Sequence, residues 1–424
     1  MTNNNILFSL SLLLLLSCGN KIKSDVNDQV DNVNADTVAA DTFSVSASSD
    51  SIIAVDSATT ADEKKVETVK DTCPLSITRA KEITKNGSLL IPSVKVKGLY
   101  ITGPIAGSKR MNSIVDLITS TELNTIVLDI KNDGGELTYR INNPTAIESG
   151  ACYRYVRDMP AFLDRMHKNG IYVIGRIVCF KDPILAKHKP DLALCKPDGA
   201  YVTDGKGLPW VNPYKKEVWN YLCELAEQAT EDGFDEIQFD YVRFPIGKDA
   251  NAACYGANLK EYTREQLLTD FFSYVQNRLH EKNIVWGADL FGTVIGSNPD
   301  RYMTGQNYPA LAKVTDAICP MIYPSHYRNN TFGLAVPDAE PYKTILKACQ
   351  LSQKILNDTL HTPKARVRPW LQCFTAKWVK GHISYGSQQL KEQIQAVYDS
   401  GYDEWILWNA ANRYDYVKNA VSKN

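Results

Sequence analysis

Two aspartates, Asp240 and Asp289, interrupt apolar segments that resemble neighbouring buried strands. Charged groups are rarely buried in a strand without a partner or a function, because removing them from water costs free energy. Two carboxyl groups on adjacent strand ends suit cleavage of a glycosidic bond. One donates a proton to the leaving oxygen, and the other attacks the anomeric carbon or activates water. Asp129 is a possible third member of this group.

The neighbours of the two aspartates predict different protonation states. Arg176 or Arg243 beside Asp240 would keep that carboxylate ionised, as a nucleophile requires. Asp289 shares an apolar segment with Trp286, where desolvation would raise the pKa of the carboxyl group toward that of a useful acid. The alternative is that Asp240 and Arg243 form only a structural ion pair at a strand end.

Aromatic and polar side chains near the predicted strand ends are candidates for binding a sugar. Sugar rings present apolar faces that stack on Trp and Tyr, while polar side chains bind the hydroxyls. The candidate substrate-binding residues are Asp129, Lys131, Arg176, Trp210, Arg243, Tyr323, His326, Trp370, Gln372, Trp408 and Asn409. Any one of the aromatic residues could be part of the core, but together they favour a carbohydrate site.

Motifs for other chemistries are missing from the sequence. It contains no GxSxG, HExxH or Walker motif, and no cysteines at CxxC spacing. We therefore expect no obligatory metal and no cofactor. Cys152, Cys195 and Cys254 lie in predicted loops, where a disulfide is possible in an oxidising compartment.

Eight apolar runs alternate with helical patterns, which predicts a (β/α)8 barrel. The expected strands are Val96–Thr102, Thr125–Lys131, Tyr172–Phe180, Glu236–Phe244, Val285–Phe291, Ala317–Tyr323, Val367–Phe374 and Trp405–Asn409. The expected helices are Met111–Thr121, Met159–Lys168, Lys215–Glu231, Arg264–Glu281, Tyr308–Lys313, Tyr342–Leu356 and Gln388–Asp399.

Loop lengths support the barrel. Connections from helix to strand are short and contain a glycine, whereas those from strand to helix are long, as in Lys181–Tyr214 and Pro324–Glu340. In a parallel barrel the long loops lie together on the catalytic face. A doubly wound open sheet is the alternative, but no glycine-rich phosphate loop follows the first strand.

The N-terminal part differs in composition from the rest. An apolar run, Ile6–Leu16, precedes Leu15-Leu16-Ser17-Cys18, which resembles the lipobox of bacterial lipoproteins, although no Lys or Arg comes before the run. We expect a signal peptide (1–18) with lipidation at Cys18, an acidic disordered tether (19–72) and a barrel domain (73–424). An ordinary cleaved signal peptide is the alternative. The expected location is the cell envelope, with the lipid as the only membrane attachment.

The net charge of −1 and the lack of basic clusters give no reason to expect nucleic-acid binding. A carbohydrate is the expected partner, and the oligomeric state is left open.

Four segments resemble a family of bacterial glycoside hydrolases that form TIM barrels distantly related to the α-amylase superfamily. They are Val96–Tyr100, Asn124–Lys131, Gln238–Pro245 and Ala288–Gly292, and the similarity runs from about Lys95 to the C-terminus. The resemblance implies a nucleophile at Asp240 and a proton donor at Asp289. The superfamily commonly has glutamate as the strand-five acid, whereas this chain has aspartate. A carbohydrate-binding protein on a degenerate hydrolase barrel is the competing hypothesis. A deacetylase would need a metal triad that the sequence does not show.

Overall fold

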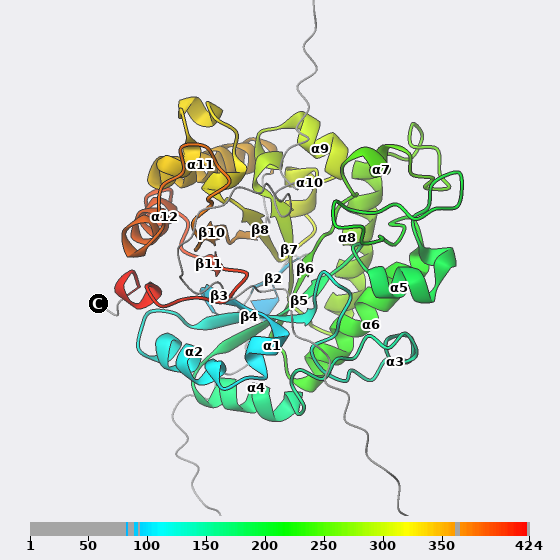
Figure 1. Cartoon of the computed structure of the whole chain (residues 1–424), viewed down its shortest axis with the longest axis horizontal. Coiled ribbons are helices and arrows are strands. Elements are labelled where there is room, and N and C mark those ends of the chain that lie inside the picture. The colour runs from blue at the N-terminus through cyan, green and yellow to red at the C-terminus, as the bar shows by residue number, and fades with distance from the viewer. Residues whose placement is uncertain (1–81, 84–88, 92–93, 361–364, 422–424) are drawn as a thin grey trace, which may run out of the picture. The chain divides into compact units, whose positions relative to one another are not determined.

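The computed structural model describes residues 82–83, 89–91, 94–360 and 365–421. Parallel strands form a closed barrel surrounded by helices (Figure 1). In barrel order the strands are β3 Lys97–Ile101, β4 Thr125–Lys131, β5 Tyr172–Val178, β6 Glu236–Asp240, β7 Trp286–Phe291, β8 Ala317–Met321, the pair β9 Arg366–Val367 and β10 Trp370–Gln372, and β11 Trp405–Trp408. β11 pairs with β3 and closes the ring. The predicted (β/α)8 barrel is confirmed.

Seven helices connect successive strands, and each overlaps a predicted helix. They are α2 Arg110–Thr119, α4 Met159–Lys168, α6 Lys216–Asp232, α8 Arg264–Glu281, α10 Tyr308–Ala312, α11 Pro341–Thr359 and α12 Ser387–Asp399. α8 begins at a capping box between Thr263 and Gln266, which satisfies backbone N–H groups that the first turn leaves free. Shorter helices lie in the strand-to-helix segments: α1 Gly103–Ala106, α3 Pro144–Glu148, α5 Pro183–His188, α7 Lys248–Asn251 and α9 Asn298–Thr304. A two-stranded antiparallel pair, β1 Glu82–Ile83 with β2 Leu90–Ile91, precedes the barrel.

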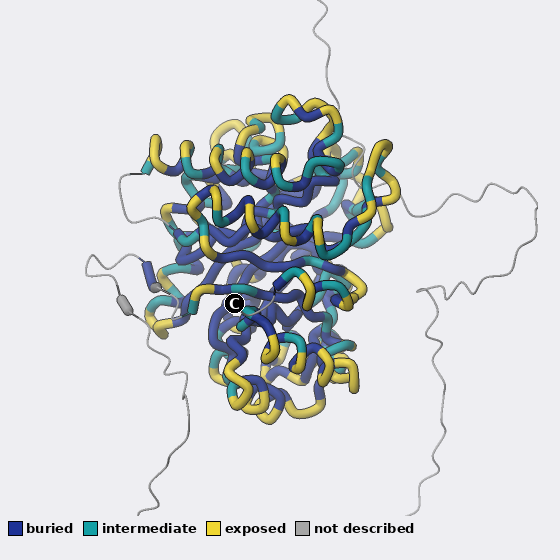
Figure 2. Tube along the Cα trace, turned by 90° about the vertical axis from the view of Figure 1, so that its left-hand side faces the viewer, coloured by how far each residue is buried: buried dark blue, intermediate teal, exposed yellow. Residues whose placement is uncertain are grey.

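Alternate side chains of the strands supply two separate apolar regions. Those that face outward, such as Ile237 and Phe239, pack against the helices, while those that face inward, such as Val127, Ile174 and Ile406, fill the barrel. Figure 2 shows the resulting distribution, with buried residues throughout the interior and exposed ones on the outer turns. The inward positions near the carboxyl ends of the strands are polar, and these carry the candidate chemistry.

The amino-terminal end of the barrel is filled by ion pairs. Arg368 is fully buried and contacts Glu236 of β6 and Glu404, just before β11, with 2.6 Å between its Nε and Glu404 Oε2. At the same end, Leu90 is buried and donates its backbone N–H to Asp316, which precedes β8. This end is therefore closed, which leaves the carboxyl end of the barrel for chemistry.

Two predicted strands differ most from the observed ones. β6 ends at Asp240 because Tyr241 adopts a left-handed conformation with φ of 51°. The expected alternation therefore stops there, and Val242 packs in the outer apolar region rather than inside the barrel. The predicted strand Val367–Phe374 is divided into β9 and β10 around Pro369, which has no N–H to donate to a neighbouring strand.

The predicted signal peptide, Cys18 and the tether lie outside the described residues. Among the helices that the structure describes, none is long and apolar enough to cross a membrane.

Candidate active site at the carboxyl end of the barrel

Arg176 of β5 lies at the centre of a buried carboxylate cluster. Its Nη1 is 2.5 Å from Asp129 Oδ1 of β4, and its Nη2 and Nε are 2.5 and 3.0 Å from Asp240 Oδ2 of β6. Tyr100 of β3 donates its hydroxyl to the other oxygen of Asp129 at 2.6 Å. Since β3 to β6 are consecutive strands of the barrel, this cluster joins four strands at one level.

Asp289 of β7 completes the cluster in a different way. Its Oδ1 accepts hydrogen bonds from Trp370 Nε1 at 2.6 Å and from Gln238 Nε2. Its Oδ2 is buried and has no hydrogen-bond partner among the described residues. Burial, together with repulsion from Asp240, raises the pKa of Asp289 well above its ordinary value. Asp289 therefore carries a proton under conditions in which an exposed aspartate would be ionised.

The spacing of Asp240 and Asp289 is compatible with glycosidic bond cleavage. The two residues follow a paired position, Phe239 opposite Ala288, on adjacent strands. Arg176 Nε lies 3.0 Å from Asp240 Oδ2 and 3.9 Å from Asp289 Oδ2. These two distances limit the separation of the oxygens to about 7 Å, which overlaps the range of roughly 5–9.5 Å found in retaining and inverting glycosidases.

Tyr241 holds Asp240 from the other side. Its backbone N–H donates to Asp240 Oδ1 at 2.5 Å. The φ of 51° that permits this bond costs a residue with a β-carbon about 1–2 kcal/mol. Strained residues persist only where the surrounding structure holds them in place, and they are found most often at functional sites. Both oxygens of Asp240 are thus fixed, one by Tyr241 and one by Arg176.

Aromatic rings surround the guanidinium of Arg176. Tyr100 and Trp408 stack with their centroids 4.0 Å apart, and the guanidinium lies 5.5 Å from each ring. Trp408 is partly exposed, whereas Trp370 contacts both rings edge-on and is buried. Trp408 therefore keeps part of its surface exposed to solvent, while Trp370 donates a hydrogen bond to Asp289.

Three of the predicted binding residues use their polar groups inside the protein. Lys131 forms a buried ion pair with Asp182 at 2.7 Å. Gln372 donates to Asp338 at 2.9 Å, and the side-chain amide of Asn409 donates to two backbone carbonyls. These contacts hold the long loops in place.

The other predicted binding residues differ in their surroundings. Trp210 and Tyr323 are buried. His326 shares a hydrogen bond with Ser325 Oγ at 3.0 Å, and burial lowers its pKa to about 4, so it is neutral near pH 7. Arg243 is buried but does not pair with Asp240, in contrast to the ion pair considered from the sequence.

The sequence correctly predicted that Asp289 is buried, but it named the wrong neighbour. Trp286 points outward and packs against Phe239 and Phe272, so it does not desolvate Asp289. Gln238 and Trp370 are the side chains that contact its carboxyl group, and both donate hydrogen bonds to Oδ1. Gln238 lies two residues before Asp240 on the same strand, and this period of two is the signal that could have identified it.

Tyr100 is a further site residue that sequence reasoning missed, and Lys181 lies at the site as well. Lys181 pairs with Asp133 and Asp204 at 2.9 Å each and lies 5.2 Å from the ring of Tyr241. Its place just after β5 is the signal that pointed to it.

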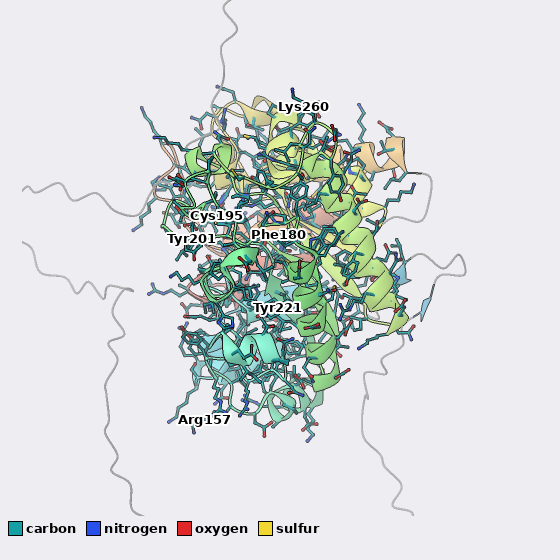
Figure 3. All side chains as sticks on the ribbon, turned by 90° about the vertical axis from the view of Figure 1, so that its right-hand side faces the viewer. Arg157, Phe180, Cys195, Tyr201, Tyr221 and Lys260 are labelled. Atoms are coloured by element: carbon teal, nitrogen blue, oxygen red, sulfur yellow. The ribbon has the colours of Figure 1, made fainter. Side chains whose placement is uncertain are left out.

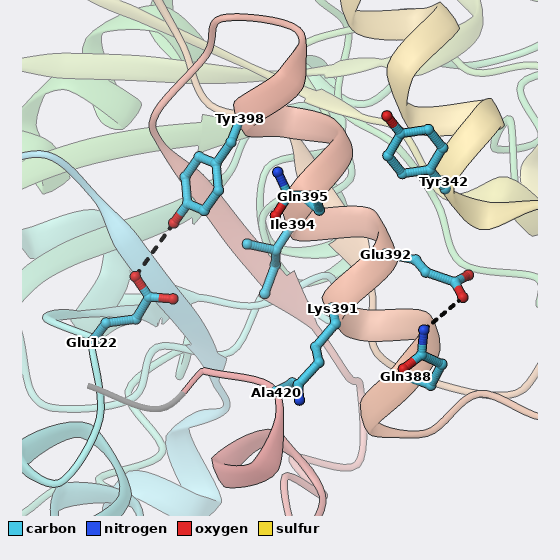
Figure 4. A pocket seen from close by; sticks show the side chains of 9 residues that line it. All are labelled: Glu122, Tyr342, Gln388, Lys391, Glu392, Ile394, Gln395, Tyr398 and Ala420. Carbon is cyan, nitrogen blue, oxygen red and sulfur yellow. Dashed lines mark hydrogen bonds between the residues drawn. The ribbon is translucent and has the colours of Figure 1, made fainter. Parts of the chain in front are cut away.

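An open groove on the outside of the barrel, with a volume of 610 Å³, is a separate feature (Figure 4). Side chains of α12 form most of its wall, together with Tyr342 of α11 and Glu122. The carboxylate cluster does not line it, so this groove is not the candidate active site. Among the described residues no group of three or more His, Cys, Asp or Glu side chains is arranged to hold a metal ion.

A closed parallel barrel with carboxyl groups gathered at the carboxyl ends of its strands is the architecture of a (β/α)8-barrel enzyme, and it is compatible with the glycoside hydrolase class. A family described as "Putative glycosyl hydrolase domain" matches residues 98–414. The chain belongs to this family.

A solved structure of low sequence identity shares the fold. The glycoside hydrolase domain of PgaB (BpsB) from Bordetella bronchiseptica aligns with 78% of this chain and 100% of its own, with a TM-score of 0.55 and 11% identity. A hypothetical protein from Ruminiclostridium thermocellum is 40% identical and covers 45% of this chain and 96% of its own, with a TM-score of 0.42. No curated protein matches the sequence significantly.

Proposed function

We propose that the protein hydrolyses glycosidic bonds of an oligosaccharide or polysaccharide, with Asp240 and Asp289 as the reacting carboxyl groups. The observation that carries the proposal is that two adjacent carboxyl groups have opposite surroundings. Asp240 accepts hydrogen bonds from the cation Arg176, whereas Asp289 has a raised pKa and one oxygen without a hydrogen-bond partner among the described residues. This is the division between base or nucleophile and acid that glycosidases need.

In the proposed reaction, Asp289 donates the proton on Oδ2 to the oxygen of the leaving sugar. Asp240 attacks the anomeric carbon or removes a proton from the attacking water. Arg176 holds Asp240 in position, and Trp408 offers a face for stacking of the sugar ring. The family description supports this class of reaction.

Carbohydrate binding without catalysis is the second candidate. The observation in its favour is that Asp240 is 5% and Asp289 1% exposed, so substrate must displace side chains to reach them.

Reducing-sugar release from a panel of α- and β-linked polysaccharides distinguishes the two candidates. We expect release by the full chain, and a loss of at least about 100-fold in Asp240→Asn and in Asp289→Asn. NMR of the first product anomer then decides between retention and inversion. A glycan that binds to the proteins but is cleaved by none of the three would establish the binding function instead.

We also propose that Cys18 is lipidated and attaches the protein to the cell envelope. The apolar run before Leu15-Leu16-Ser17-Cys18 supports this proposal. Metabolic labelling with a fatty acid should mark the protein, and Cys18→Ala should abolish the label.

A further inference from the structure

Arg243 is a buried cation that forms no salt bridge among the described residues. The described residues contain five buried Lys and Arg side chains, and four of them form salt bridges with carboxylates: Lys131, Arg176, Lys181 and Arg368. Arg243, which is 4% exposed, forms none. Its one hydrogen bond within the described residues runs from Nη1 to the backbone oxygen of Phe244 at 3.0 Å. A guanidinium has five N–H donors, so most of its capacity is unused.

Aromatic rings enclose the Arg243 guanidinium in place of carboxylates. It lies 4.9 Å from the ring of Trp210, 5.1 Å from Tyr241 and 4.7 Å from Phe291. Burial lowers the pKa of Arg243, and the nearby Tyr241, Asp240 and Asp204 offset only part of this effect. Such a cage keeps the charge in place and leaves the donors of the guanidinium free.

A second donor without a partner lies in the same cage. The indole Nε1 of Trp210 is buried and has no hydrogen-bond partner among the described residues. A buried donor without an acceptor costs about 1–3 kcal/mol, which a ligand oxygen would recover. Two unsatisfied donor groups beside one another are therefore suited to an anion.

The position of Arg243 connects this anion site with the proposed reaction. Arg243 comes three residues after Asp240, and Phe291 is two residues after Asp289, so the cage is built on the ends of the same two strands as the reacting pair. Its ligand would be part of a sugar at or next to the bond that is cleaved.

We propose that Arg243 binds a carboxylate of the substrate, so that the glycan contains a hexuronic acid or another carboxylate-bearing sugar. The planar fork of a guanidinium matches a carboxylate with two parallel hydrogen bonds. The placement of this sugar next to the cleaved bond rests on the proposed hydrolase function. The recognition of the carboxylate does not.

Acidic polysaccharides and their carboxyl-reduced forms test the proposal, because reduction converts each uronic acid to the neutral sugar and keeps every linkage. Polygalacturonate, alginate and hyaluronan would each be compared with the reduced form. Binding is measured by tryptophan fluorescence with the full-length Asp240→Asn protein. Hydrolysis is measured with the wild type. We expect binding of at least one acidic polymer to be roughly 10- to 100-fold tighter than binding of its reduced form, since a hydrogen bond to a charged group contributes on this scale.

Two substitutions of Arg243 define the chemistry further. Arg243→Gln should remove the preference for the acidic form, and Arg243→Lys should restore only part of it. Arg264→Gln is the matched control, because Arg264 also lies over two aromatic rings, Phe244 and Tyr255, at 5.3 and 5.5 Å. It should keep the preference.

Each outcome separates the two proposals. Equal binding or cleavage of acidic and reduced polymers, or no binding of any acidic polymer, overturns the carboxylate site. Binding that depends on Arg243 without cleavage of any polymer overturns the hydrolase function and leaves the carboxylate site standing. If Arg243→Gln fails to fold, the wild-type comparison of acidic and reduced polymers still decides.

Discussion

Asp240 and Asp289 show how a fold gives the same functional group two different surroundings. An arginine compensates the charge of Asp240, whereas Asp289 receives two hydrogen bonds on one oxygen and none on the other. Because the pKa of Asp289 is raised in the folded protein, the folded state keeps a proton that the unfolded chain releases. Across the interval between the two pKa values, the free energy of unfolding therefore falls as the pH rises.

The Asp289→Asn substitution tests this difference directly. An asparagine imitates the protonated carboxyl and never ionises, so the free energy of unfolding near neutral pH should be unchanged or higher than in the wild type. Hydrolysis should fall by about 100- to 10,000-fold, as expected for the loss of a general acid. Urea unfolding from pH 4 to 9 provides the measurement. A variant destabilised at neutral pH would show that Asp289 is ionised in the folded state.

Some of these residue properties could be predicted from the sequence and others could not. A carboxylate in an apolar strand predicts a buried acid. The strand positions of Asp240, Asp289 and Arg176 predicted that these residues are neighbours. The choice between Arg176 and Arg243 as the partner of Asp240 depends on the direction of each side chain. That direction is decided by the backbone of Tyr241, and no pattern in the sequence predicts a left-handed tyrosine.

At the scale of elements, the end of β6 determines the geometry of the site. The left-handed Tyr241 ends the strand and reverses the sides to which the next residues point, so Arg243 enters an aromatic cage rather than an ion pair. Apolar alternation predicted the strands well because it reports burial. It could not predict the break in β6, since Tyr241 and Val242 suit a strand by composition.

A pair of truncations measures the strain at Tyr241. Both Tyr241→Ala and Tyr241→Gly remove the ring, but glycine adopts positive φ without a steric cost. The glycine variant should therefore unfold with a free energy about 1 kcal/mol higher than the alanine variant, which is opposite to the usual order of these residues. Chemical denaturation of the two proteins gives the difference. The usual order, with alanine the more stable, would mean that the conformation is not strained.

Two long loops on the catalytic face meet at a pair of cysteines. Cys195, labelled in Figure 3, lies opposite Cys254 in an antiparallel bridge, and the N–H of Cys254 donates to the oxygen of Cys195 at 2.8 Å. Residues paired in this way have Cα atoms about 5.5 Å apart, which a disulfide can span. Both thiols are free in this structure.

Oxidised glutathione should therefore join Cys195 to Cys254 by thiol–disulfide exchange. The crosslink should raise the free energy of unfolding by up to about 4 kcal/mol, because it closes a long loop in the unfolded chain. Peptide mapping without reduction identifies the bond. Cys152, which is partly buried and has no cysteine partner among the described residues, is the internal control and should remain a thiol. Full alkylation of all three cysteines after the oxidation step would contradict the prediction.

At the scale of the whole barrel, closure depends on contacts between the first and last strands. Asn412, just after β11, accepts a hydrogen bond from the backbone N–H of Thr102 at 2.9 Å and donates to the oxygen of Tyr100 at 3.0 Å. It too has a positive φ, which asparagine tolerates better than most residues. The fold class could be predicted because eight repeated units leave few alternatives. The seam formed by these contacts of Asn412 could not be predicted, because it joins residues from opposite ends of the barrel sequence.

Asn412→Ala should lower the free energy of unfolding by about 2–4 kcal/mol, since several buried hydrogen bonds are lost together. Asn330→Ala is the matched control, because Asn330 has a similar φ of 67° but is exposed. The control should cost about 1 kcal/mol or less. Urea denaturation monitored by tryptophan fluorescence measures both. Equal losses would show that conformation, and not the seam, accounts for the effect.

The contact between Leu90 and Asp316 has a consequence for access to the barrel. It places Leu90 at the pole opposite Asp240, at the amino-terminal ends of the strands. Because that pole of the described barrel is closed, a ligand that reaches Asp240 would have to enter and leave on the same side, between the long strand-to-helix loops.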